Sequence, residues 1–541
     1  MSLFGLFDIG KSALFASQSA LNVVSNNIAN VNTPGYNRQD VVLEVASAVQ
    51  VRGNYLGRGV RVNEIRRNYD KFIHLQILGQ NQSFGRSYAL DRSLSQVEQI
   101  FNEAKDLGLS KSLQNYFNAW QGVASNPEDQ AQRTALLQQA DALVLNAKQM
   151  ERDVSSALDN VNLEIRNVVD KINSITSEIS LLNEKMSLTE AGQGENEASY
   201  MRDQRDQLLN DLAGLINYTW YEDNNNYVTI LVGGKSLVTP QQAYELSTST
   251  DLEGNSTITY NDEDITSVFN KGQLGGYLDV KDDIESETLT RLRKLIASIV
   301  KETNTLHQSG YGLDGSTNND FFGPLQIYSL DYSSGAYISS AVVSDTSALT
   351  LDEYDINFTG ASTYDIINQT TGATVASGQS YSAGSTITFD GIDVVIDGAP
   401  AAGDSFFISP LTGVIENFSV ALTDTRKIAA ASSNLTLPGD NTKALQMYQL
   451  SQNGVSNLSG ATFDNYYSGI VSNLGIMSKA ASDSLTYDDN MLFELQKKRE
   501  QTSGVSLDEE AANLIRYQRS YEAGARILKV TDELLEMIIN L

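Results

Sequence analysis

The stretch Asn26-Asn27-Ile28-Ala29-Asn30-Val31-Asn32-Thr33-Pro34-Gly35-Tyr36 ends an apolar stripe that begins near the N-terminus. Within and before it, Leu14, Leu21 and Ile28 recur every seven residues, which is typical of a helix that packs on another helix. Pro34-Gly35 stops this helix and redirects the chain. Because Asn and Ser lower helix propensity throughout the segment, we expect it to be mostly disordered unless a partner covers it.

A second apolar stripe with the same period lies at the other end of the chain, at Leu507, Leu514, Tyr521, Leu528 and Leu535. Each stripe is too small to form a core unaided. We therefore predict that the two stripes pack on each other and on neighbouring copies of the chain.

The asparagine side chains of the first stripe would fix the register of this packing through buried hydrogen bonds. On this basis we expect Asn27→Leu to strengthen the helix pairing but to loosen its register. The predicted subunit interface comprises the seams and the turn: Leu14, Leu21, Val24, Asn26, Asn27, Ile28, Asn30, Val31, Thr33, Pro34, Gly35, Tyr36, Leu507, Leu514, Tyr521, Leu528 and Leu535.

The 541-residue chain is strongly acidic, with a formal net charge of −29, which repels nucleic acid and anionic lipid. We expect no membrane insertion, because the sequence lacks an uninterrupted apolar run of about 18 residues. It has no cysteine, so neither disulfides nor thiolate metal sites contribute. The first residues do not resemble a cleaved secretory signal, which alone would suggest a cytoplasmic protein.

The strongest periodic signal lies between Val154 and Met186, where ten apolar residues recur at alternating steps of four and three. This pattern predicts a helix from about residue 128 to about residue 188, roughly 90 Å long at ~1.5 Å per residue. We interpret this stripe as an intramolecular core contact, which is the usual role of an amphipathic face.

Two segments show strand alternation, at 218–268 and at about 320–412, and Asp390-Gly391 in the second favours a hairpin turn. Helical spacing returns at 278–306 and from Asn441 to Arg499. The predicted fold is mixed and multi-domain, with terminal helices in a coiled coil, an elongated helical bundle and inserted β-rich domains. The predicted domains are 1–50 with 504–541 (terminal coiled coil), 51–216 with 270–318 and 413–503 (helical rod), 217–269 (small β module) and 319–412 (outer β module).

Candidate chemical sites all have simpler interpretations. His74 and His307 each lack neighbours for a metal site or triad and are expected to be structural. Val232–Ser236 ends like a phosphate loop but lacks its first glycine, and is expected to be a hairpin turn. Asp314–Asp320 resembles a calcium loop without its glycine and glutamate, so we expect turns there and leave weak calcium binding open.

The acid pairs Asp282-Asp283 and Asp488-Asp489 could in principle serve glycoside hydrolysis, but are most simply solvated faces. We therefore predict no catalytic, cofactor or metal site, and no enzyme.

The motif at 26–36 resembles the signature shared by bacterial flagellar rod, hook and hook-associated proteins. Ser503-Gly-Val-Ser-Leu-Asp-Glu-Glu-Ala-Ala-Asn-Leu-Ile-Arg-Tyr-Gln518 resembles the C-terminal signature of the branch that joins hook to filament. Further similarity to that branch lies at Asn304, His307, Gly310, 312–315, 320–322 and 398–404.

The resemblance implies a structural subunit of the extracellular flagellum, exported unfolded through the flagellar type III apparatus without a cleaved signal. Its implied partners are copies of itself in a ring, hook protein on one side, a second junction protein and the filament on the other, and an export chaperone on the C-terminal helix. In this family the terminal helices line the central channel, a helical layer follows, and the β domains face outward.

Three other functions remain open from the sequence. The N-terminal motif alone does not separate a junction subunit from another hook or rod subunit. An extracellular adhesin would place its binding chemistry in residues 320–412, and a secreted glycan hydrolase would need a cleft with a perturbed carboxylate.

Overall fold

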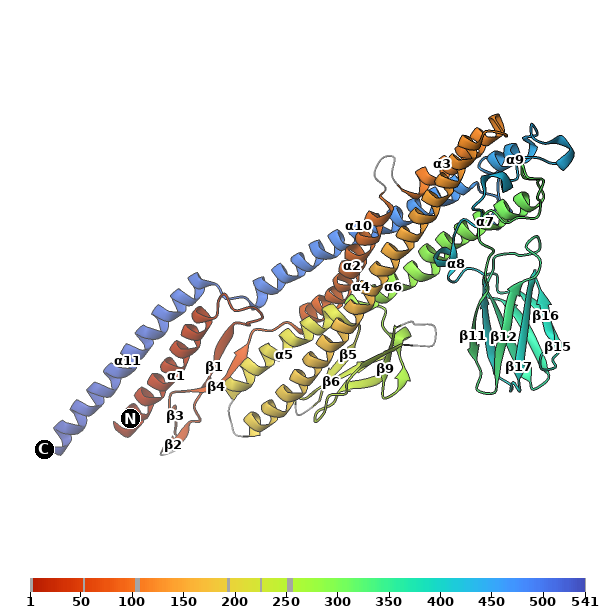
Figure 1. Cartoon of the computed structure of the whole chain (residues 1–541). Coiled ribbons are helices and arrows are strands. Elements are labelled where there is room, and N and C mark those ends of the chain that lie inside the picture. The colour runs from red at the N-terminus through yellow and green to blue at the C-terminus, as the bar shows by residue number, and fades with distance from the viewer. Residues whose placement is uncertain are drawn as a thin grey trace. The chain divides into compact units, whose positions relative to one another are not determined.

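The computed structural model describes residues 3–51, 54–102, 108–191, 195–223, 226–250 and 256–540 (Figure 1). Contacts divide the chain into two compact units, and each is assembled from separate stretches of sequence. Unit 1 comprises residues 1–91, 162–278 and 481–541, and unit 2 comprises 92–161 and 279–480. Among the described residues, none of the helices combines the length and the hydropathy needed to cross a membrane. The predicted mixed, multi-domain class with long terminal helices is confirmed.

The helices of unit 1 include both ends of the chain: α1 (Leu3–Ala29), α5 (Glu195–Leu215) and α11 (Leu507–Ile539). Four helices of the described chain have residues in both units: α2 (Lys71–Phe101), α4 (Gln130–Ala191), α6 (Gly272–Asp282) and α10 (Phe463–Ser503). Helix α4 confirms the long helix that the sequence predicts. Its apolar stripe is buried throughout except at Leu158, which is half-buried, so this stripe belongs to an internal core.

The strands of unit 1 form small antiparallel sheets. They are β1 (Gln39–Val45) with β4 (Val60–Arg67), β2 (Val49–Val51) with β3 (Asn54–Leu56), then β5 (Thr219–Glu222), β6 (Val228–Val232) and β7 (Lys235–Val238), and finally β8 (Ser247–Thr250), β9 (Ser256–Tyr260) and β10 (Glu263–Asp264). A short 3₁₀ turn follows at Thr266–Val268. Gly233 and Gly234 have φ of 55° and 82° between β6 and β7. The sequence that ends like a phosphate loop is therefore a hairpin turn, as predicted.

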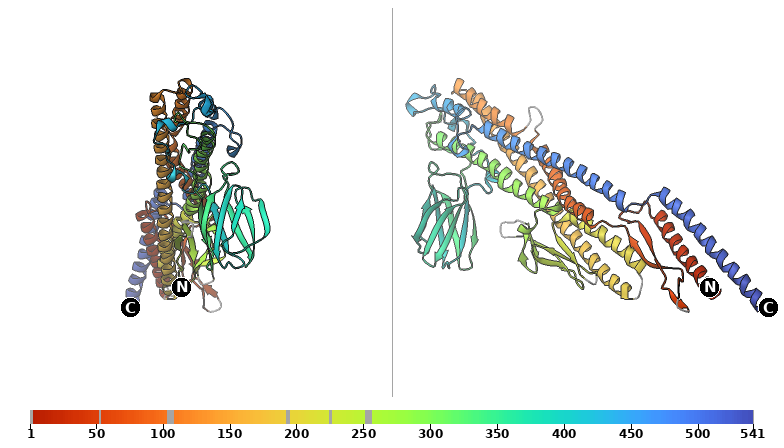
Figure 2. Two further views of the ribbon diagram at one scale, coloured as in Figure 1. Left: turned by 45° about the vertical axis from the view of Figure 1, so that its right-hand side comes forward. Right: turned by 180° about the vertical axis from the view of Figure 1, so that it is seen from behind.

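Helix α1 lies beside α11 and also contacts strands β1 and β4. Figure 2 shows the two terminal helices next to each other from two further directions. On the β side, Ser12 Oγ accepts a hydrogen bond from the Val60 N–H at 3.3 Å. The N-terminal helix is thus covered on two sides within its own chain.

Unit 2 has a helical part whose core is aromatic. Its helices are α3 (Leu109–Ser125), α7 (Thr290–Gln308), α8 (Val414–Asn417) and α9 (Thr442–Leu450), with a π-helical turn at Asp283–Leu289 and 3₁₀ turns at Thr425–Lys427, Asn434–Thr436 and Ser456–Leu458. Trp120 of α3 lies 5.3 Å from Phe321 between ring centroids, and Phe322 lies 4.8 Å from Phe418. These rings tie α3 and the segments that follow α7 and α8 into one core.

The remaining strands of unit 2 form two antiparallel sheets. One has the order β11 (Tyr328–Tyr332), β18 (Ser405–Ser409), β13 (Tyr354–Gly360), β14 (Thr363–Asn368), β15 (Thr374–Ser380), and the other β12 (Ala336–Val343), β17 (Ile392–Gly398), β16 (Thr386–Phe389). Asp390 and Gly391, at φ of 43° and 80°, form the predicted hairpin turn. No lysine or arginine occurs between Lys301 and Arg426, whereas fifteen acidic residues do.

The segment from Asn441 to Arg499, expected to be helical, is interrupted. Helix α9 ends at Leu450 and α10 begins at Phe463. Between them, Ser459 and Gly460 adopt φ of 57° and 78°, which a helix does not accommodate. The prediction was wrong in this interval.

Both histidines are buried. His307 Nδ1 lies 2.6 Å from the Asn319 carbonyl oxygen, and His307 Nε2 accepts from the Ala429 N–H at 2.9 Å. Burial lowers the pKa of His307 to about 4 and that of His74 to about 4, so both rings are neutral at pH 7. His307 therefore joins helix α7 to two loops of unit 2.

Of the acidic motifs, Asp314 forms a turn by accepting hydrogen bonds from Ser316 N (3.0 Å) and Oγ (2.6 Å), as expected. The solvated interpretation of Asp488 was wrong. Asp488 is buried and accepts from Gln80 Nε2 at 2.8 Å and from Ser87 Oγ at 2.6 Å. It joins α10 to α2 within unit 1. The described part of the chain contains no group of three or more His, Cys, Asp or Glu side chains placed to hold a metal.

Candidate assembly interface

The candidate interface is the pair of terminal helices, which run antiparallel. Gly10 of α1 lies against Leu528 of α11, Leu14 lies against Gly524, and Asn27 bonds to Glu510. Residue numbers therefore rise along α1 as they fall along the facing part of α11. This register places Leu21 near Tyr517 and Val24 near Leu514.

Asn27 is the centre of a buried hydrogen-bond network at the end of α1, where its side chain is only 1% exposed. Asn27 Nδ2 donates to the Gln39 carbonyl at 2.9 Å and to Glu510 Oε2 at 3.2 Å. Asn27 Oδ1 accepts from the Gln39 N–H at 3.0 Å and from the Tyr36 hydroxyl at 2.8 Å. All four hydrogen-bonding positions of the amide are used. One side chain thus holds α1, the turn, strand β1 and the start of α11 together.

Arg38 provides the charge that balances Glu510, which is 1% exposed. Arg38 Nε lies 2.9 Å from Glu510 Oε1, and Arg38 Nη1 donates to Glu509 Oε2 at 2.7 Å. Burial lowers the pKa of the Arg38 guanidinium, but the carboxylates, Glu510 foremost, outweigh it and raise that pKa above its ordinary value. The Arg38 N–H also donates to the Ser503 carbonyl at 2.9 Å. Arg38 therefore fixes the chain just before and just inside α11.

A second cluster joins the same turn to α5. Asn37 Nδ2 donates to Asp203 Oδ1 at 2.6 Å, and Arg67 Nη1 lies 2.5 Å from Asp203 Oδ1 and 3.1 Å from Asp206 Oδ2. Burial raises the pKa of both Asp203 and Asp206, against the opposing effect of Arg67. These carboxylates therefore depend on the Arg67 guanidinium to stay ionised in the core.

Apart from Asn26 and Asn27, the predicted interface residues fall into three groups. The half-buried or buried seam residues are Leu14, Leu21, Val24, Ile28, Leu514, Leu528 and Leu535. The turn residues are Asn30, Val31, Thr33, Pro34, Gly35 and Tyr36. Leu507 (53% exposed) and Tyr521 (41% exposed) are the most exposed of the predicted seam residues.

Only one of the three asparagines meets the expectation of a buried register-fixing amide. Asn26 is exposed, and Asn30 Nδ2 donates to Asn26 Oδ1 at 2.9 Å while Asn30 Oδ1 accepts from Thr33 Oγ1 at 3.1 Å. These bonds close the end of α1 locally. Asn27 alone bonds across the helix pair among these asparagines.

Apolar side chains remain exposed on the faces of both terminal helices that point away from the seam. On α11, Ile527, Val530, Leu534 and Met537 recur at helical spacing, with exposures from 37% to 61%, and Ile527 borders the seam because its Cγ2 lies close to Gly10. On α1 the exposed apolar residues are Phe4, Phe7 and Phe15. The pair buries one seam and leaves these two apolar faces uncovered within the chain.

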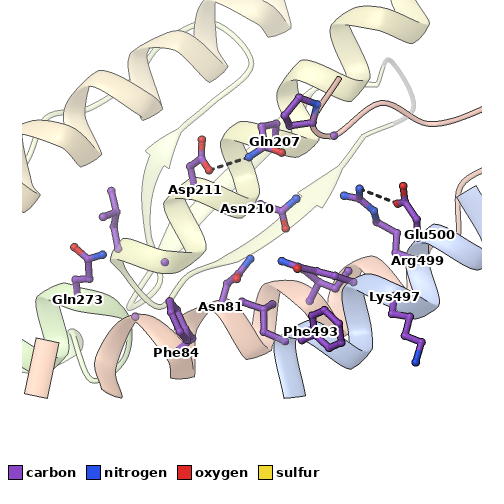
Figure 3. Close-up of a pocket in the computed structure, with 18 of the residues that line it drawn as sticks. Asn81, Phe84, Gln207, Asn210, Asp211, Gln273, Phe493, Lys497, Arg499 and Glu500 are labelled. Carbon is purple, nitrogen blue, oxygen red and sulfur yellow. Dashed lines mark hydrogen bonds and ion pairs between the residues drawn. The ribbon is translucent and has the colours of Figure 1, made fainter. Parts of the chain in front are cut away.

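Pro34 and Gly35 lie in the wall of a cleft of about 880 Å³ within unit 1. Figure 3 shows that α2, α5 and α10 supply other walls, with amide side chains such as Asn81 and Asn210 among the lining residues. Gly35 has φ of +80°, and a Cβ there would lie 3.0 Å from Gln207 Oε1. The turn therefore favours glycine for its backbone conformation.

The sequence interpretation missed four residues of this interface: Gly10, Gly524, Arg38 and Glu510. Glu510 and Gly524 belong, with Tyr517 and Thr531, to a second set of α11 residues that recur every seven positions. Because this set is not apolar throughout, the search for apolar stripes did not reveal it. The available signal was the interruption of a helical stripe by a glycine at each end of the chain.

Parts of the chain match four described families. Residues 94–322 match the flagellar hook-associated protein FlgK helical domain, and 331–410 match the D2-like domain of flagellar hook-associated protein 1. Residues 7–37 match the flagella basal body rod protein family, and 497–541 match the C-terminal family of the flagellar basal body rod FlgEFG proteins.

Relatives align over nearly the whole chain. Flagellar hook-associated protein 1 of Escherichia coli (strain K12) is 30% identical over 553 residues, which cover 99% of both chains. The protein of that name from Salmonella typhimurium is 31% identical over 556 residues, again 99% of both, and that from Bacillus subtilis 24% over 577 residues, 100% of this chain and 98% of the relative. The solved flagellar hook junction protein FlgK from Burkholderia pseudomallei shares the fold, with a TM-score of 0.66 and 19% identity over 79% of this chain and all of that one.

Proposed function

Because the chain belongs to the flagellar hook-associated protein 1 family, we propose that it is a structural subunit of the junction between flagellar hook and filament. The observation that carries this proposal is the buried hydrogen-bond network at Asn27, which joins the N-terminal signature to the C-terminal signature. A helix pair held in this way presents one surface built from both ends of the chain.

We propose that neighbouring copies cover the apolar faces left exposed on α1 and α11. The chain as a whole is strongly acidic, so association of copies needs apolar contacts that outweigh the repulsion. Exposed isoleucine, leucine and phenylalanine side chains at helical spacing supply such contacts, at about 25 cal/mol per Å² of buried apolar area.

A deletion strain tests the proposed function. Cells without this protein are expected to carry hooks but no filaments in electron micrographs, because filament subunits would lack their attachment surface. A plasmid copy of the intact chain should restore the filaments. Filaments on hooks of the deletion strain would contradict the proposal.

We also propose that the terminal helices become stably ordered only in the assembly. Ordering about thirty residues opposes folding by a conformational entropy that the contacts of one helix pair do not offset alone. Hydrogen exchange on the free chain should therefore show weak protection at residues 5–30 and strong protection in unit 2. Strong protection of 5–30 in dilute monomer would show that neighbouring copies are not required.

The finer points of the family resemblance are part of this proposal. We propose export in an unfolded state without a cleaved leader, a ring of copies with hook protein on one side and the second junction protein and filament on the other, a chaperone on α11, and no catalysis. The four-domain division, with 1–50 and 504–541 as the channel-lining coiled coil, is proposed in the same way.

A further inference from the structure

We propose that Gly10 and Gly524 are positioning residues that select the register of the α1–α11 pair, each receiving a leucine from the opposite helix. This inference rests on the proposed assembly role of the pair and adds the residues that specify its geometry.

The two contacts are reciprocal. A Cβ at Gly10 would lie 3.0 Å from Leu528 Cδ2 and 3.1 Å from Ile527 Cγ2. A Cβ at Gly524 would lie 3.3 Å from Leu14 Cγ and 3.4 Å from the Leu14 backbone nitrogen. The helix backbones therefore approach each other here more closely than they could around a larger side chain. Glycine weakens a helix interior, and these contacts give a reason for its presence at both sites.

The apolar seams alone do not fix one register. Leu514, Tyr521, Leu528 and Leu535 are spaced by seven, so sliding α11 by one heptad still opposes apolar residues to α1. The same slide would place Tyr521 or Leu535 against Gly10, and Tyr517 or Thr531 against Leu14. In the observed register alone, Leu528 meets Gly10 while Leu14 meets Gly524.

The hydrogen bond between Asn27 and Glu510, at the C-terminal end of α1, agrees with this register. Asn27 is thirteen residues beyond Leu14, and its partner Glu510 is fourteen residues before Gly524. Two independent contacts, one of packing and one of hydrogen bonding, therefore specify the same alignment.

Adding a large side chain at Gly10, with and without removing the one at Leu528, tests the proposal. Gly10→Leu should remove filaments from hooks, because its side chain meets Leu528, and Gly10→Leu with Leu528→Ala should restore them at least in part. Gly79→Leu is the matched control, since a Cβ at this helical glycine meets nothing within 4 Å. Normal filaments with Gly10→Leu, or no recovery in the double variant, would overturn the proposal.

Cysteine pairs report the register directly, because the chain has no cysteine of its own. In isolated flagella, Leu14→Cys with Gly524→Cys should form a cross-link within one chain. Leu14→Cys with Tyr517→Cys or with Thr531→Cys, each one heptad away, should not. Equal cross-linking of the three pairs would overturn the proposal. If the deletion strain kept its filaments, the proposed function would be wrong. The three cysteine pairs, measured in a concentrated solution of the purified chain, would still test the register of α1 and α11.

Discussion

Replacing Asn27 by leucine is expected to detach filaments from hooks, because it removes four hydrogen bonds at a site where water has no access. The Gln39 N–H and carbonyl, the Tyr36 hydroxyl and one oxygen of Glu510 would all lose a partner. Unsatisfied buried groups cost about 1–3 kcal/mol each, so the loss of four partners is expected to cost at least about 4 kcal/mol. This reverses the expectation from sequence alone that leucine would strengthen the pairing. Electron microscopy of hooks in cells that make the variant measures the effect.

Asn26→Leu is the matched control for this prediction. The same residue type is replaced one position earlier, where the side chain is exposed and accepts a hydrogen bond from Asn30. Exposed substitutions usually change stability by less than about 0.5 kcal/mol. Equal filament counts for Asn26→Leu and Asn27→Leu cells would show that the buried amide has no special role in the junction.

Leu514→Asp is expected to abolish filament attachment while leaving unit 2 folded. Leu514 is half-buried on the seam of α11, and the register places it near buried Val24. The new carboxylate would lose water, and it would lie one helical turn from the buried carboxylate of Glu510, which repels it. We expect a loss of about 2–4 kcal/mol from the helix pair. Circular dichroism of the purified chain checks that the remaining fold is intact.

Leu145→Asp provides the comparison, since Leu145 is 65% exposed on α4 and lies in unit 2. The same change in side chain should there leave filament attachment as in unmodified cells. Filaments on the hooks of Leu514→Asp cells would mean that the seam is wrongly assigned.

Much of the fold could be predicted because periodicity and turn chemistry are local. The stripe from Val154 to Met186 specified helix α4, and the Gly233-Gly234 and Asp390-Gly391 dipeptides specified hairpins whose backbone they permit. The break between α9 and α10 was missed although two dipeptides typical of turns, Asn453-Gly454 and Ser459-Gly460, lie within it.

The interface could be predicted only in part, because its specificity comes from distant partners. Apolar heptads identify a helix that needs a partner, but they give neither the direction nor the register of the pair. Those depend on Asn27 meeting Glu510, 483 positions away, and on the two glycines. Likewise, nothing near Asp488 in the sequence shows that Gln80 and Ser87 enclose it.

The cation-free stretch between Lys301 and Arg426 has a consequence for crowding. Strand β15 lies at the edge of its sheet and is mostly exposed, and an open edge of this kind invites strands from other molecules to pair with it. Where many copies lie close together, the acidic β-sheets of two neighbouring copies repel each other within the screening distance of about 8 Å at physiological ionic strength. This repulsion disfavours strand pairing at the open edge of β15, and therefore fibrous aggregation. Contacts between molecules are then made by the apolar ends of the chain.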